Sequence, residues 1–247
     1  MPANTTIDPA DVARFEKLGA QWWSARGPMA QLHKLNPVRV KFIRDHAARR
    51  FGDIDPLKPQ PLAGLGILDI GCGGGILCEP LTRLGAAVTG IDPGPGNIGI
   101  ARTHAGQSGL EIDYRAETAE ALAASGAQFD AVLAMEVVEH VTDVAAFVAT
   151  ACSMVKPGGL FFAATLNRTL KSFALAIVGA EYVLRWLPVG THNWQQFVTP
   201  EELARPVKAA GLDMMDQTGV VYNPLRDEWA AGRDMDVNYM VVAGRKF

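Results

Sequence analysis

Two features near residues 70 and 92 could together bind a nucleoside. Residues 66–77 read Gly-Ile-Leu-Asp-Ile-Gly-Cys-Gly-Gly-Gly-Ile-Leu, which predicts a buried strand, a glycine turn and the start of a helix. Glycines in such a turn let a ligand lie against bare main chain, close to the N–H groups of the helix. The next apolar stretch ends in Asp92, where a carboxylate can accept hydrogen bonds from both hydroxyls of a ribose. The alternative is that the turn only connects a strand to a helix.

The spacing of the glycines separates one nucleoside ligand from another. A dinucleotide fingerprint has the pattern G-x-G-x-x-G around a pyrophosphate. Gly71 and Gly73 fit this pattern, but Ile76 stands at the third glycine position. Asp69 adds an acid at the turn, which suits an ammonium group and repels a phosphate. The turn therefore favours S-adenosylmethionine, with its α-amino group, over NAD.

A second group of polar residues follows the predicted strand 129–134. Glu136, Glu139 and His140 would share one side of a helical turn. His140 could act as a general base near neutral pH, or it could be a helix-start histidine that bonds to the backbone. The three residues together could also bind Mg²⁺, which prefers oxygen ligands. The alternative for the two acids is a helix cap and ordinary surface charge.

Composition narrows the classes of function. The 247 residues suit one large domain with additions, and 49% of them are hydrophobic. A net charge of −3 argues against a nucleic-acid partner. The three cysteines lack paired spacing, so reduced thiols in a cytoplasm are expected. We find neither the hydrophobic region of a signal peptide at the N-terminus nor an apolar run long enough to span a membrane.

The remaining pattern predicts an α/β protein. Asp8-Pro9 and Asn36-Pro37 each indicate the start of a helix before the first strand, so residues 1–60 are expected to form a helical cap and linker. Residues 61–247 then alternate between strands and helices. This alternation predicts a doubly wound, mostly parallel sheet, which we expect to be seven-stranded and Rossmann-like. Two strands near residues 212–221 and 237–244 would end the chain as an antiparallel pair.

An insertion over residues 168–198 interrupts this alternation after the fifth strand. Its segment 171–187 is apolar nearly all round, and few charges flank it. One interpretation is a buried crossover helix. The other is an interfacial helix that sinks into the headgroup layer of a membrane.

Several motifs resemble those of class I methyltransferases. They are Asp-Ile-Gly-Cys-Gly-Gly-Gly at 69–75, Gly-Ile-Asp at 90–92, Met135 to His140, and Lys-Pro-Gly-Gly at 156–159. Five further stretches resemble the ubiquinone-biosynthesis O-methyltransferases more specifically: residues 35–39, 165–169, 178–182, 190–192 and 236–240.

This resemblance implies methyl transfer from S-adenosylmethionine to phenolic hydroxyls of polyprenylated intermediates at two steps, leaving S-adenosylhomocysteine. It implies cofactor contacts at Arg39, Gly71, Asp92 and Met135, although a lone arginine on an amphipathic helix is usually solvated. Some members are thought to need a divalent ion, for which Mg²⁺ at Glu136, Glu139 and His140 is the candidate.

The resemblance also bears on partners and location. A prenylated substrate implies contact with an anionic membrane surface, at the inner face of the cytoplasmic membrane, and with other enzymes of ubiquinone biosynthesis. Two alternatives to this function remain. One is a soluble small-molecule methyltransferase of another pathway, and the other is a non-catalytic nucleoside-binding scaffold in a biosynthetic complex. An NAD-linked oxidoreductase is disfavoured by Ile76.

Overall fold

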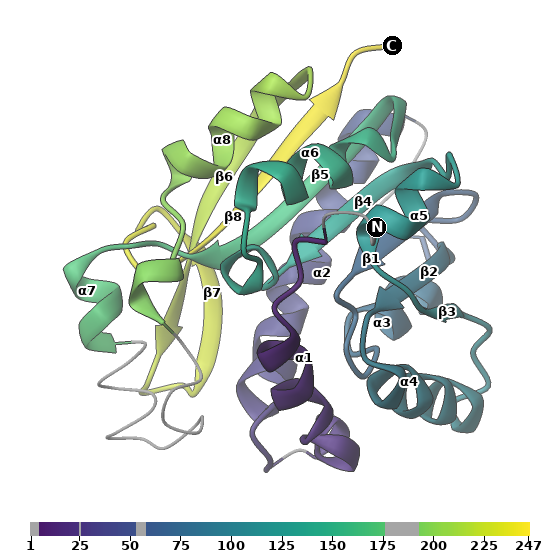
Figure 1. Ribbon diagram of the computed structural model, residues 1–247, viewed down its shortest axis with the longest axis horizontal. Coiled ribbons are helices and arrows are strands. Elements are labelled where there is room, and N and C mark those ends of the chain that lie inside the picture. The colour runs from purple at the N-terminus through teal and green to yellow at the C-terminus, as the bar shows by residue number, and fades with distance from the viewer. Residues whose placement is uncertain (1–4, 25, 53–57, 176–192) are drawn as a thin grey trace.

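One sheet runs through the computed structural model, which describes residues 5–24, 26–52, 58–175 and 193–247 (Figure 1). Within those residues the sheet has eight strands in the order β3-β2-β1-β4-β5-β8-β6-β7. In chain order the strands are β1 (Gly66–Ile70), β2 (Ala87–Asp92), β3 (Asp113–Ala116), β4 (Phe129–Met135), β5 (Val155–Leu166), β6 (Leu212–Asn223), β7 (Glu228–Gly232) and β8 (Asn238–Arg245).

The first five strands pair with one another in parallel, and the last three form only antiparallel pairs. β1 lies between β2 and β4, with Ile67 opposite both Val88 and Ala131. β8 pairs antiparallel with β5, and β6 pairs antiparallel with both β8 and β7. Because parallel strands point the same way, the carboxyl ends of β1, β2 and β4 meet at one edge. That edge is where ligands bind in open α/β sheets.

Helices cover both faces of the sheet, and two apolar cores result. One face carries α2 (Ala30–Phe51), α3 (Cys78–Arg83) and α4 (Pro95–Gln107); the other carries α5 (Ala119–Ala124), α6 (Val144–Ser153) and α8 (Pro200–Ala209). Successive strand residues point to opposite faces. Phe161 of β5 therefore joins the α6 and α8 side, whereas its neighbour Phe162 joins the α2 side. Both side chains are fully buried.

Short elements complete the described structure. α1 (Pro9–Glu16) and η1 (Gly19–Trp23) precede α2, η2 (Val138–His140) follows β4, and α7 (Leu170–Ser172) and η4 (Trp194–Gln196) precede α8. The predicted helix start at Asp8 is confirmed. Asp8 caps α1, and Thr199 and Glu202 form a capping box on α8. No helix in these described ranges is both long and apolar enough to cross a membrane.

The predicted doubly wound α/β fold is confirmed, with two corrections of detail. The sheet has one strand more than the seven expected, because β7 lies in the connection between β6 and β8, where only a loop was expected. The helix predicted to begin at Asn36-Pro37 begins at Ala30, and Pro37 lies inside α2. Buried Leu35 and Ile43 of this helix pack against the sheet on either side of Pro37, and this packing offsets the hydrogen bond that a proline removes.

Two expectations, the boundary near residue 60 and the apolar segment 171–187, concern residues that are only partly described. The division near residue 60 remains a prediction, and residues 53–57 lie outside the described ranges. Most of the apolar segment 171–187 also lies outside them, and of it only residues 171–175 are described.

Candidate active site

The glycine turn after β1 leaves bare main chain at the carboxyl edge of the sheet. Gly71 and Gly73 have φ values of 69° and 52°, a region that glycine adopts without strain. A Cβ atom at Gly71 would lie 2.7 Å from Cγ2 of Val137, and one at Gly73 would lie 2.3 Å from Cη2 of Trp22. Val137 and Trp22 thus occupy the space that the side chain of a larger residue at Gly71 or Gly73 would need.

Asp92 ends β2 beside this turn, and three hydrogen bonds hold its carboxylate in place. Oδ1 accepts from the Gly94 N–H at 2.8 Å and from Asn97 Nδ2 at 3.1 Å. Oδ2 accepts from the Gly73 N–H at 3.1 Å. Burial raises the pKa of Asp92, and these hydrogen bonds partly counter it. The acid predicted from the sequence is therefore fixed next to the glycine turn.

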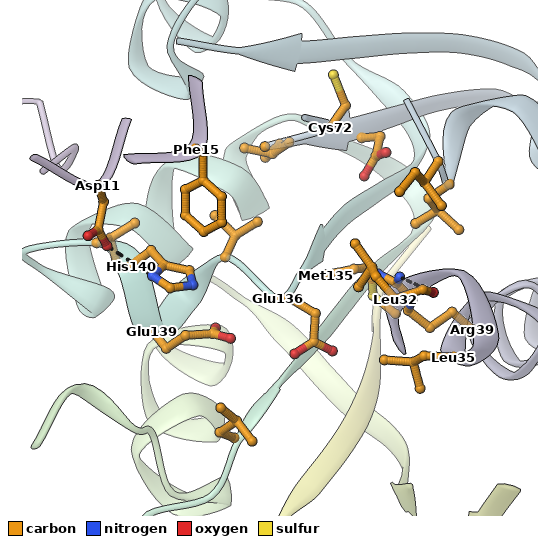
Figure 2. Close-up of a pocket in the computed structure, with 18 of the residues that line it drawn as sticks. Asp11, Phe15, Leu32, Leu35, Arg39, Cys72, Met135, Glu136, Glu139 and His140 are labelled. Atoms are coloured by element: carbon orange, nitrogen blue, oxygen red, sulfur yellow. Dashed lines mark hydrogen bonds and ion pairs between the residues drawn. The ribbon is translucent and has the colours of Figure 1, made fainter. Parts of the chain in front are cut away.

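A cavity of about 580 Å³ lies along these features, within the usual size of a small-molecule site. It is bordered by Gly71, Asp92, Met135 and Arg39, the four residues expected to contact a cofactor. It also reaches residues 117–119, which follow β3. Figure 2 shows how residues from distant parts of the chain surround this space. The structure thus brings the four predicted residues around one cavity.

Arg39 is the most distant of these residues in the sequence, and α2 carries it to the cavity. The residue is only 3% exposed. Its Nη2 donates to the Leu32 carbonyl at 3.4 Å, and its Nε has no hydrogen-bond partner among the described residues. Burial lowers the pKa of Arg39, whereas the charges of Glu136 and Asp69 raise it. The interpretation of Arg39 as a solvated surface residue was wrong, and a buried guanidinium favours an anionic partner.

Asp69 places a second carboxylate at the base of the cavity. It is buried, and the Cys78 thiol donates to its Oδ2 at 3.1 Å. Burial raises the pKa of Asp69 to about 6, while the Cys78 hydrogen bond and Arg39 counter that rise. An acid at this point offers an acceptor for an ammonium group, as the sequence predicts.

Glu136 directly follows β4 and borders the cavity. Its φ of 59° is unusual for a residue other than glycine, and its N–H donates to the Ala164 carbonyl at 2.8 Å. In Figure 2 its carboxylate lies between Glu139 and Arg39. Burial, and then the charge of Glu139, raise the pKa of Glu136 to about 7, although Arg39 counters them. Backbone strain and a perturbed acid often occur together at functional sites.

His140 lies beside Glu139 on η2 and is held by the N-terminal helix. Its Nδ1 is 2.9 Å from Oδ2 of Asp11, and its ring meets the Phe15 ring edge-on at 5.1 Å between centroids. A carboxylate only accepts, so Nδ1 carries the proton in this bond. Burial lowers the pKa of His140, but the Asp11 hydrogen bond and the charge of Glu139 outweigh it, so the pKa is raised.

The predicted magnesium ligands do not form a metal site as they stand. Over the described ranges, no group of three or more His, Cys, Asp or Glu side chains is placed to hold a metal ion. Oε2 of Glu139 instead accepts from Thr165 Oγ1 at 2.8 Å, and His140 bonds to Asp11. In this arrangement the three predicted ligands therefore do not converge on a point where Mg²⁺ could bind.

Sequence reasoning missed the residues that close the cavity. The side chain of Trp22 lies over the glycine turn, and its Nε1 donates to Asn97 Oδ1 at 3.0 Å. Trp23 Nε1 donates to the Gly74 carbonyl at 2.8 Å. The two tryptophans appear in the sequence only as part of an amphipathic stripe, which gives no sign that they cover a site. Asn97 could have been found, since it lies in the first turn of the helix after Asp92.

Comparisons with known proteins place this geometry among the methyltransferases. Residues 41–217 match the family model described as a methyltransferase domain. The ubiquinone biosynthesis O-methyltransferase of Methylobacterium sp. (strain 4-46) is 62% identical over 99% of this chain and 98% of its own length. The protein of the same name from Azorhizobium caulinodans is 58% identical over 100% of this chain and 97% of its own.

Solved structures agree on the fold. Magnesium protoporphyrin IX methyltransferase from Synechocystis PCC 6803, solved with bound SAM, has a TM-score of 0.61 at 15% identity, covering 99% of this chain and 100% of its own. The same enzyme with bound SAH has a TM-score of 0.59 at 19% identity, and 85% of each chain is covered.

Proposed function

The chain belongs to the family of the ubiquinone biosynthesis O-methyltransferases, and on this premise we propose that its cavity is the active site of an S-adenosylmethionine-dependent O-methyltransferase. The acceptors are phenolic hydroxyls of polyprenylated intermediates at two steps of ubiquinone biosynthesis. The observation that carries the proposal is the single cavity that joins Arg39, Asp92 and Glu136 at the carboxyl edge of the sheet.

The residues around the cavity fit S-adenosylmethionine in charge and shape. Asp92 would hold the ribose hydroxyls, and the bare main chain at Gly71 would take the methionine end. Arg39 would pair with the carboxylate of the cofactor. This carboxylate would accept a hydrogen bond from the Arg39 Nε, which has no partner among the described residues. Asp69 would accept from the α-amino group, and Met135 would border the adenine or the methionyl side. When bound, S-adenosylmethionine supplies an electrophilic methyl group on a sulfonium centre.

The chain itself has two tasks in this reaction. It must hold the phenol oxygen in line with the reacting atoms, and it must accept the phenolic proton. We assign the second task to His140. Asp11 holds the proton on Nδ1, so the neutral ring presents Nε2 as an acceptor. The Asp11 hydrogen bond and the charge of Glu139 raise the pKa of His140, which makes the ring a stronger base.

The N-terminal segment excludes water from the cofactor end of the cavity. Trp22 is only 6% exposed, and it covers the glycine turn. Isolated bridge pairing joins Ile7 to Val141, and both the N–H and the hydroxyl of Thr6 donate to Glu120. These contacts attach the segment before α1 to α5 and to the residue after η2, so they hold the N-terminal segment against the site. A dry site strengthens the electrostatic interactions inside it.

Contact with a membrane surface is part of the proposal, and the described start of the insertion supports it. Leu170 is 82% exposed, Leu175 is 54% exposed and Phe173 is 44% exposed. Lys171 lies among them. Exposed apolar side chains are typical of an interfacial segment, and the charge of Lys171 is balanced by ion pairs with Asp234 and Asp236. Replacing Leu170 and Leu175 by Asp should abolish co-sedimentation with anionic liposomes, and retention of binding would contradict this role.

The assay for the function uses purified protein with S-adenosylmethionine labelled in the methyl group and a short-chain prenylated catechol. We expect label in the extracted prenylated product, with and without chelation of Mg²⁺ as parallel arms. Cofactor binding without turnover in either arm would favour the non-catalytic scaffold. Turnover of water-soluble phenols alone would favour a methyltransferase of another pathway.

A further inference from the structure

Part of the cavity lining has no role in the methyl-transfer chemistry, and we call the space along this part the arm. This arm is bordered by Leu32 and Leu35 of α2 and by Val220, Tyr222 and Trp229 of β6 and β7. In Figure 1 the tip of the β6–β7 hairpin extends past the start of β8, and β7 contacts α2. Leu35, Val220 and Trp229 belong to the same apolar cluster. The arm therefore has two facing walls, one helical and one from the hairpin.

The hairpin wall is fixed in place by pairing within it. Tyr222 and Trp229 are directly opposite in the register of β6 and β7, and their ring centroids lie 5.2 Å apart. Val220 precedes Tyr222 by two residues and so shares its face of the strand. The hydroxyl of Tyr222 donates to Asp227 Oδ1 at 2.5 Å, in the turn of the hairpin.

Polar contacts attach this wall to α2. Trp229 Nε1 donates to Gln31 Oε1 at 3.2 Å, and Lys34 forms an ion pair with Asp227. Both contacts join the hairpin to α2, so they fix the two walls relative to each other.

The distribution of charge indicates what the arm can hold. Asp69, Asp92 and Glu136 lie at or next to the carboxyl ends of β1, β2 and β4, and Arg39 of α2 interacts with the charges of Asp69 and Glu136. The arm is bordered mainly by Leu, Val and aromatic side chains. Lys171 and Asp234 also border the cavity, and they form an ion pair with each other. A ligand group in this arm gains free energy by leaving water and gains little from charge. Leu225, two residues beyond β6, is 95% exposed and continues the apolar surface outward.

We propose that the arm between α2 and the β6–β7 hairpin holds the isoprenoid chain of the acceptor, with Trp229 and Tyr222 as its outer wall. The proposal rests on the proposed function, which supplies a phenol with an apolar tail. The ring then lies at Glu136 and His140, the first isoprene units lie against Leu35 and Val220, and the tail leaves past the hairpin. These side chains make the enzyme prefer prenylated over unprenylated catechols.

The first test compares kcat/KM for a farnesylated catechol and for the same catechol without its tail. Trp229→Ala should lower the preference for the farnesylated acceptor at least tenfold, and Trp229→Phe should restore most of it. Arg226→Ala is the matched control, because it lies in the same hairpin but does not border the cavity; it should keep the wild-type preference. Equal losses on both acceptors, or no change in preference, would overturn the proposal.

The second test needs no turnover. A farnesylated catechol with a diazirine at the end of its tail is bound to the wild-type protein, irradiated and mapped by mass spectrometry. Labelled peptides from residues 30–35 or 220–229 support the channel, and labelling confined to other peptides overturns it. Wild-type protein that methylates neither acceptor would contradict the proposed function instead, and the crosslink then decides the position of the tail by itself.

Discussion

Replacing Asp92 by alanine should weaken S-adenosylmethionine binding about a hundredfold. The carboxylate lies at the end of β2 and borders the cavity, with protein donors already holding its orientation. A ribose would add hydrogen bonds to a charged acceptor, each worth about 1.5–3 kcal/mol. Losing about 3 kcal/mol in total corresponds to about a hundredfold in Kd.

The same residue offers a control for folding. Because burial raises the pKa of Asp92, the charged form is less favourable in the folded protein than in the unfolded chain. Asp92→Asn keeps the size of the side chain and removes that cost, but its Nδ2 would face an N–H that the carboxylate accepts from, so we expect a melting temperature close to the wild-type value. It should still weaken cofactor binding, although less than Asp92→Ala does.

Isothermal titration calorimetry with S-adenosylhomocysteine measures the effect directly, alongside thermal unfolding of each variant. A Kd for the folded Asp92→Ala protein within about threefold of wild type would refute the reasoning. That result would mean that the ribose lies elsewhere, even though the fold resembles that of other methyltransferases.

Three further predictions follow from the same cavity. The free energy of unfolding of Glu136→Gln, relative to that of wild type, should be about 3 kcal/mol higher at pH 8 than at pH 4.5. The reason is that the pKa of Glu136 is raised to about 7 in the folded protein, so the wild type loses stability as the pH rises and this acid ionises. Urea unfolding at both pH values measures the difference, and a difference that does not change with pH would contradict the prediction. Asp11→Asn should lower the pKa of His140, since it removes the anionic acceptor from Nδ1; an unchanged NMR titration of the ring would exclude that link. Gly73→Ala should displace Trp22, whose ring lies 2.3 Å from the added Cβ, and thereby shift tryptophan fluorescence and weaken cofactor binding; a spectrum and Kd like those of wild type would contradict the close packing.

The cofactor end of the site could be predicted from the sequence because its signals are local. The glycine turn follows β1 and Asp92 ends β2, and the carboxyl ends of parallel strands meet at one edge. Met135, which was expected only from the family resemblance, ends β4 at the same edge. No long-range information is needed to expect them near one another.

The rest of the site depends on contacts that the sequence does not encode locally. Asp11 and His140 are 129 residues apart, and only the packing of α1 over η2 brings them together. The burial of Arg39 depends on which face of α2 meets the sheet, and a helical pattern with a proline inside it does not settle that face. β7 is short and lies at an edge of the sheet, so its residues carry little of the alternation that indicates a strand.

The central claim is that the adenosyl group binds at the carboxyl edge of the sheet, inside this cavity. A crystal structure with S-adenosylhomocysteine tests it most directly. We predict ribose hydroxyls within hydrogen-bond distance of the Asp92 carboxylate and the carboxylate of the ligand beside Arg39. Ligand bound at another surface, or bound in the cavity with its ribose away from Asp92, would contradict the claim.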